Sequence, residues 1–167
     1  MTAALAFKPG FLDIWNFGGT GVGDAARYVR VQVEKARQHG ESTETHRVPV
    51  AAHLLKEISD IWVECNKPNW DGYGAFPVNA NAISEAIDFA KLVPSWLPQP
   101  EVAAEPDGAI GFEWNAGKDR VFVASVSGNG IIVYAGLLGP GNKAHGTTVF
   151  GGRTPNDIFQ FVSRVFS

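Results

Sequence analysis

The stretch from Pro98 to Leu138 decides the fold, and it reads PQPEVAAEPDGAIGFEWNAGKDRVFVASVSGNGIIVYAGLL. Three short turn signals interrupt it, namely Asp107-Gly108, AGKD and SGNG. Gly, Asp and Asn tolerate the positive φ angles that tight hairpin turns require. The pattern predicts strands near Glu101–Glu105, Ala109–Asn115, Arg120–Val126 and Ile131–Leu138. Strands joined in this way form an antiparallel β-meander.

The faces of these strands differ in how clearly the sequence specifies them. In the second strand, Ile110, Phe112 and Trp114 share one face, and Gly111 and Glu113 share the other, so its register is well specified. The later strands VFVASV and IIVYAGLL are apolar on both faces, a pattern typical of strands buried on both sides. We therefore expect helices, an N-terminal arm or a partner to cover both faces of the sheet.

The chain after the meander predicts one more strand and a closing helix. The glycine-rich GPGNKAHG breaks the strand pattern at Gly139 to Gly146, and TTVF after it would raise the sheet from four strands to five. Thr154-Pro155-Asn156-Asp157 is typical of a helix start, with a capping hydroxyl, a proline and an early acid. The helix that follows is apolar over a wide face and should dock on the sheet.

Two helices are predicted before the meander. The first begins with Pro49, runs to Asn66 and shares an apolar face that includes Leu54, Ile58 and Cys65. The second is capped by Asn79 or Asn81, ends at Pro94 and buries a face that carries Ile83, Ile87, Ala90 and Val93. Residues 1–48 are predicted to form a loosely attached arm and helix. The whole chain, residues 1–167, is then a single α+β domain.

Composition narrows the function classes. The 14 Lys and Arg residues and 17 Asp and Glu residues give a net charge of −3, so the strong positive field typical of nucleic-acid binders is missing. The single cysteine forms no internal disulfide, and no stretch resembles a signal peptide or a membrane span. The four histidines lack metal-ligand spacing. We expect a cytoplasmic protein without cofactor, metal or membrane attachment, for which nucleic acid is a disfavoured partner.

Two motifs carry a family resemblance. The segment NWDGYGAFPV is followed by a helix and then by PDGAIGFEW, and together they resemble a family of small, uncharacterised bacterial proteins with WDGYGA-P and DG-I-EW elements. The likeness covers about Trp70 to Tyr134. It implies no reaction and no catalytic residue, and it implies a mobile or defence-related bacterial setting.

The WDGYGA motif is the first candidate site. Trp70 and Tyr73 flank Asp71 in a predicted turn, and aromatic and acidic side chains on a loop frequently form recognition surfaces. The structural alternative is favoured by turn chemistry. In that interpretation Asp71 and Gly72 make the turn, while Trp70 and Tyr73 fill the gap between helices and sheet.

The remaining candidates are charged. Glu113 lies between Phe112 and Trp114 and must face solvent, a partner or a cation, and a cross-strand ion pair with Arg120 is the favoured outcome. Lys143, His145 and Arg153 lie in the glycine-rich segment before the last helix, whose N-terminus attracts anions.

Three functional hypotheses follow from these features. The first is a protein–protein interaction module, for example in a bacterial toxin–antitoxin or defence system, that binds another protein or itself. The alternative is an enzyme or binding protein that acts on a phosphorylated small molecule or nucleic acid through the glycine-rich residues 139–153. The third is a structural subunit or homodimer without ligand. No catalytic residue is predicted, so the sequence favours a non-enzymatic role.

Overall fold

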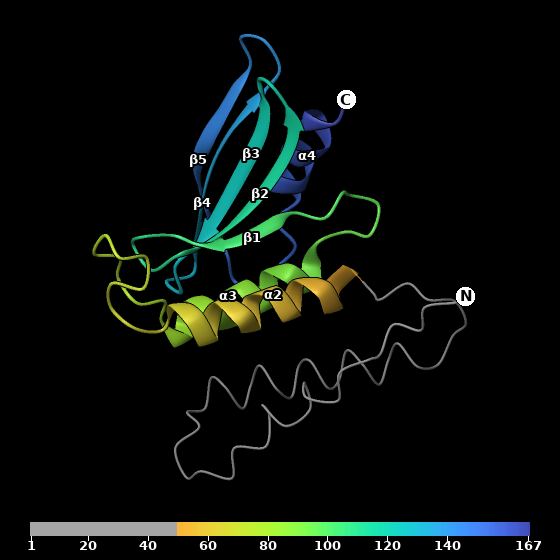
Figure 1. Cartoon of the computed structure of the whole chain (residues 1–167). Coiled ribbons are helices and arrows are strands. Elements are labelled where there is room, and N and C mark those ends of the chain that lie inside the picture. Colours follow the sequence, from red (N-terminus) through yellow and green to blue (C-terminus); the bar gives the residue numbers. More distant parts are fainter. Residues whose placement is uncertain (1–49) are drawn as a thin grey trace, which may run out of the picture.

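A computed structural model describes residues 50–167, which form an α+β fold of three helices and one five-stranded antiparallel sheet (Figure 1). The chain order of the elements is α2 (Val50–Cys65), α3 (Ala80–Leu92), β1 (Glu101–Ala104), β2 (Ile110–Gly117), β3 (Arg120–Val126), β4 (Ile131–Leu138), β5 (Lys143–Val149) and α4 (Asn156–Val165). The predicted α+β class is confirmed. The arm and helix predicted for residues 1–48, and the predicted role of Pro49, lie outside the described residues.

The sheet is a simple meander in the order β1-β2-β3-β4-β5. The predicted fifth strand is present, and it is longer than TTVF because the preceding turn is short. In that turn the Asn142 amide donates to the Gly139 carbonyl, and the Leu138 amide donates to the Asn142 carbonyl. Lys143 can therefore already pair with Leu137, so half of the predicted glycine-rich break belongs to a strand.

One face of the sheet, here called the inner face, carries the core. Helix α4 packs on β2, β3 and β4, α3 packs on β2 and β3, and α2 packs on α3 and β1 (Figure 1). Phe89 of α3 links these layers, with ring centroids 4.7 Å from Phe112 and 5.8 Å from Phe159. Burial of such aromatic rings supplies much of the stabilisation of a domain this small.

The opposite face, here called the outer face, was expected to be covered by helices, an N-terminal arm or a partner, and the arm lies outside the described residues. The three helices leave it open, and Val133 is 52% exposed while Ile131 is 38% exposed. Only alternate residues of β3 and β4, such as Phe122 and Ile132, are fully buried. Valine and isoleucine favour strands through their branched shape, so an apolar strand does not by itself require burial on both faces.

The helix ends partly follow the sequence. Asn79 caps α3 as predicted, with its Oδ1 atom accepting a hydrogen bond from the Ala82 amide at 2.9 Å. The predicted cap of α4 is wrong, since Pro155 occupies the cap position and the cap makes no side-chain hydrogen bond. The Phe159 amide donates to the Pro155 carbonyl, so the helix starts one residue later than a Thr154 cap would place it.

Candidate functional site

The WDGYGA motif forms a loop, residues 69–77, that is tied together from within and is here called the aromatic loop. Asp71 Oδ1 accepts hydrogen bonds from the amides of Tyr73 at 2.8 Å and Ala75 at 3.1 Å. Asn69 Oδ1 accepts from the Gly74 amide at 2.7 Å. The Asn69 backbone has a φ of 59°, a conformation that Asn adopts more readily than most residues. The loop is thus held by its own short polar side chains.

Trp70 anchors the aromatic loop to the body of the protein. Its ring packs against the hydrophobic core, and its Nε1 atom donates to the Phe76 carbonyl at 2.9 Å. The Asn69 amide closes the base of the loop by donating to the Ala75 carbonyl at 2.8 Å. A partly buried aromatic ring whose polar atom is hydrogen-bonded holds a surface loop in place.

The aromatic loop rests on the β1–β2 hairpin. The Phe76 amide donates to the Pro106 carbonyl at 2.8 Å, and a Cβ atom on Gly108 would lie 2.8 Å from the Pro77 carbonyl oxygen. Gly108 also has a φ of +87°, while Asp107 accepts the Ala109 amide and shapes the turn. The two motifs behind the family resemblance are therefore one contiguous structure.

Two aromatic side chains of the loop point into solvent. Tyr73 is 95% exposed and Phe76 is 68% exposed. The prediction that Tyr73 fills a gap between helices and sheet is wrong, and Trp70 alone packs inward. Hydrogen bonds from the Tyr73 and Ala75 amides hold the pKa of Asp71 below its ordinary value, so the carboxylate that shapes the loop is ionised at neutral pH. The loop presents a tyrosine and a phenylalanine on a frame that is already folded.

Glu113 does not pair with Arg120, which corrects the predicted cross-strand ion pair. Glu113 lies opposite Glu101 and Val123 on the outer face and accepts a hydrogen bond from the Asn115 amide group at 3.2 Å. Arg120 is the first residue of β3, and its Nη1 atom donates to the Val165 carbonyl at 3.1 Å. A cation is favoured there because the free carbonyls at a helix C-terminus carry partial negative charge.

The cationic residues of the predicted anion-binding segment are spread along one sheet edge. Lys143 and His145 occupy alternate positions of β5, and Arg153 lies beyond the other end of that strand. The strand from Lys143 to Val149 spans about 20 Å at the usual rise per residue. Glu113 and His145 share a row, but β3 and β4 separate them, which amounts to roughly 14 Å at ordinary strand spacing. The structure does not bring these side chains into one pocket.

A shallow groove that the sequence did not indicate lies beside α3. Its lining includes Ser84, Glu85, Asp88, Gly128 and Phe150. The Gly128 amide donates to Glu85 Oε2 at 2.6 Å, so the β3–β4 turn already uses one of the carboxylates. Within residues 50–167, no three His, Cys, Asp or Glu side chains gather as metal ligands would.

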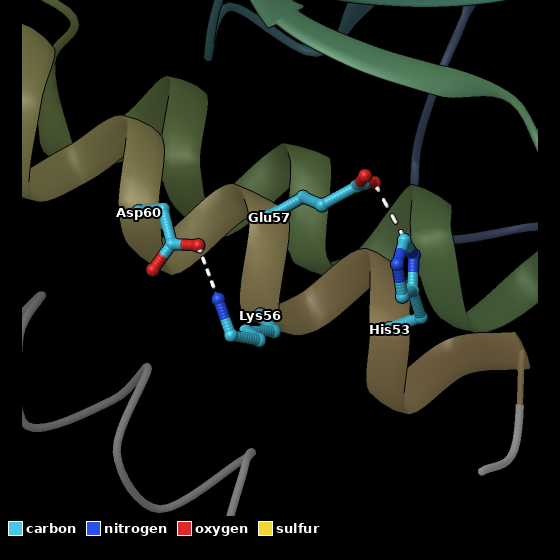
Figure 2. Close-up of polar contacts among 4 residues, drawn as sticks. All are labelled: His53, Lys56, Glu57 and Asp60. Atoms are coloured by element: carbon cyan, nitrogen blue, oxygen red, sulfur yellow. Dashed lines mark hydrogen bonds and ion pairs between the residues drawn. The ribbon is translucent and has the colours of Figure 1, made fainter. Parts of the chain in front are cut away.

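A polar group on α2 was also missed, and Figure 2 shows it. Lys56 Nζ lies 2.6 Å from Asp60 Oδ2, and His53 Nδ1 lies 3.6 Å from Glu57 Oε2. That oxygen is buried without a hydrogen-bond partner among residues 50–167, and burial raises the pKa of Glu57 even though His53 and Lys56 act in the opposite direction. The sequence gives no signal for this, because burial of one helical glutamate depends on how the helix packs.

Comparison with protein-family models, with curated proteins and with solved structures gives no match. Among the described helices, none combines the length and apolarity that a bilayer crossing requires.

Proposed function

We propose that this chain is a protein-binding module and that the aromatic loop is its contact surface. The observation that carries the proposal is the exposure of Tyr73 and Phe76, at 95% and 68%, on a loop whose backbone is fixed. A monomeric domain gains nothing for its own stability from two aromatic rings held in water. A partner that buries them gains their full apolar area.

The rigidity of the loop favours binding as much as the exposure does. Ordering a flexible loop on association costs conformational entropy, and a preorganised loop avoids most of that cost. Asp71, Asn69 and Trp70 hold the loop in place before any partner arrives. Tyrosine and other large aromatic side chains are also enriched among the residues that dominate binding free energy. The partner is expected to offer an apolar recess with a hydrogen-bond partner for the Tyr73 hydroxyl.

The alternative, a phosphorylated ligand bound through residues 139–153, would need its cationic side chains to converge. Lys143 and Arg153 lie at opposite ends of β5, so the arrangement gives this alternative no support. Participation in a bacterial toxin–antitoxin or defence system stays a prediction from the family resemblance. That prediction concerns the identity of the partner, and the proposed contact surface does not depend on it.

The test compares three alanine variants of the full chain used as bait in a bacterial lysate. Tyr73→Ala and Phe76→Ala should each lose the proteins that the unmodified chain retains, by about tenfold for a residue worth 1–2 kcal/mol. Trp96→Ala is the matched control, because Trp96 is 66% exposed and lies outside the aromatic loop. Equal retention by all three variants would contradict the proposal, as would loss that tracks unfolding measured by circular dichroism.

A further inference from the structure

The outer face of the sheet combines an apolar centre with charged borders of opposite sign. The centre is formed by Val121, Val123, Ile131, Val133, Ala135 and Leu137. Glu101, Glu105 and Glu113 border it on the β1–β2 side, and Lys143 and His145 border it on the β5 side. An exposed apolar surface with a charged rim is typical of a protein–protein contact.

The acidic border holds a like-charge pair in direct register. Glu101 of β1 is the cross-strand partner of Glu113 of β2, and like charges placed directly opposite each other destabilise a sheet. Within residues 50–167, neither carboxylate has an ion-pair partner. Glu57 of α2 lies close enough to Glu101 for their charges to repel. The border therefore keeps an unneutralised negative charge that a cation from outside would relieve.

We propose that the outer face binds the outer face of a second copy of this chain, with His145 of one copy over Glu101 of the other and Lys143 in the next row of β5, beside that pair. The two-fold axis would run parallel to the strands above β3. Such an axis places β5 of one copy over β1 of the other, and β4 over β2. Residues paired across the strands of one sheet stay at the same level along the strands of the other sheet. The two sheets would then form a sandwich about 10 Å thick.

The register of the sheet supports this axis. One row across the outer face consists of Glu101, Glu113, Val123, Ala135 and His145. Rotation about this axis places His145 of one copy against Glu101 of the other, and Val123 against Val123. The other in-plane axis, perpendicular to the strands, would set β1 against β1 and oppose the acids to each other. The repulsion between the opposed acids therefore disfavours the second arrangement and selects the first.

The outer face is a different surface from the aromatic loop. This inference therefore goes beyond the proposed function. Tyr73 and Phe76 lie in the loop before α3, and none of the residues of the proposed sandwich belongs to it. The two surfaces therefore share no residue. One chain pair would offer two aromatic loops, and such a bivalent arrangement raises avidity for a partner with two sites.

The experiment is sedimentation analysis of the full chain at low and moderate salt. The unmodified chain should dimerise, and Lys143→Glu or Glu101→Lys should each raise the dissociation constant about tenfold, because each substitution creates two repulsive contacts. An equimolar mixture of the two variants should restore the dimer as a heterodimer, since both contacts then unite opposite charges. Lys67→Glu, the same charge change on an exposed residue outside the outer face, should leave dimerisation unchanged.

Glu101→Lys also separates association from folding. It removes the repulsion with Glu113, so thermal stability should hold or rise while the dimer weakens. Tyr73→Ala should lose lysate proteins and keep the dimer, which distinguishes failure of this inference from failure of the proposed function. A chain that stays monomeric at all concentrations would overturn the sandwich. A dissociation constant that neither charge reversal changes would also overturn it. So would an equimolar mixture of the two variants that stays monomeric.

Discussion

Glu105 and Ser125 are hydrogen-bonded across β2, with the Ser125 hydroxyl 2.5 Å from Glu105 Oε1, directly above Gly111. The strand that carries Gly111 lies between the two partners, and the missing side chain at that position leaves room for the bond. A Cβ atom on Gly111 would lie 2.5 Å from the Glu105 oxygen. The glycine is thus part of the interaction although it makes no bond itself.

Gly111→Ala should therefore destabilise the protein, although alanine normally stabilises a strand relative to glycine. Loss of the bond and displacement of the carboxylate should cost about 1–2 kcal/mol. Urea unfolding measures the change. Ser125→Ala removes the same bond without crowding, so the double variant should be less destabilised than the sum of the two single variants. Full additivity would show that the bond and the glycine are independent.

Asp71→Asn should lower stability at neutral pH and lose its effect in acid. The pKa of Asp71 is lower in the folded chain than in the unfolded chain. Its ionised form therefore contributes stability above the unfolded pKa, and that contribution is lost as the pH falls through the folded pKa. Urea midpoints of the two proteins, followed from neutral pH into acid, should converge. A gap that stays constant with pH would show that the charge of Asp71 is not what holds the loop.

Glu57→Gln should have the opposite pH dependence. Burial raises the pKa of Glu57, so the folded chain binds its proton more tightly than the unfolded chain, and stability falls as the pH rises through that window. His53 and Lys56 favour the ionised form, while Asp60 and Glu101 oppose it. Removing the charge should raise the melting temperature at neutral pH, and the gain should vanish in acid.

Glu64→Gln provides the control for that measurement. Glu64 lies on the same helix and is exposed, so its substitution should change the melting temperature little at any pH. An equal gain from both glutamines would indicate a general effect of net charge. Destabilisation by Glu57→Gln at neutral pH would contradict the argument from burial.

Gly128→Ala should be strongly destabilising. The φ of Gly128 is +80°, and a Cβ atom there would lie 2.5 Å from the Asn81 carbonyl carbon at the start of α3. Positive φ costs about 1 kcal/mol for alanine, and the contact should add at least as much again. Gly141→Ala is the matched control, because Gly141 has a φ of +76° with nothing within 4 Å of the added carbon. Equal losses in the free energy of unfolding would show that the turn can move away from the helix.

The meander could be predicted because its information is local. Turn residues such as Gly108, Gly128 and Gly130 adopt positive φ where the sequence indicates turns, and alternation fixes which side of β2 is buried. The sequence underestimates the fifth strand because a glycine-rich stretch ending at Gly146 is typical of a break. In the sheet, Gly146 pairs with Tyr134, whose hydroxyl would lie 2.8 Å from an added Cβ atom, so the glycine makes room for a ring.

Other features could not be predicted because they depend on how distant segments meet. Arg120 was expected to pair with Glu113, and it instead binds the last turn of α4, which lies 45 residues away. Tyr73 was expected inside and is exposed, while Trp70 of the same loop packs against the core. The sequence also does not show that the described helices cover the inner face alone, because branched apolar residues occur in covered and in uncovered strands.

The contact between the aromatic loop and the β1–β2 hairpin restricts which substitutions the two segments can accept during evolution. The Pro77 carbonyl leaves no room for a side chain at Gly108, and the Phe76 amide needs the Pro106 carbonyl at its side. Positions 76–77 and 106–108 are therefore constrained by each other although α3 separates them in the chain. We expect them to covary across relatives, and a loop transplanted to another scaffold to keep its shape only if the hairpin travels with it.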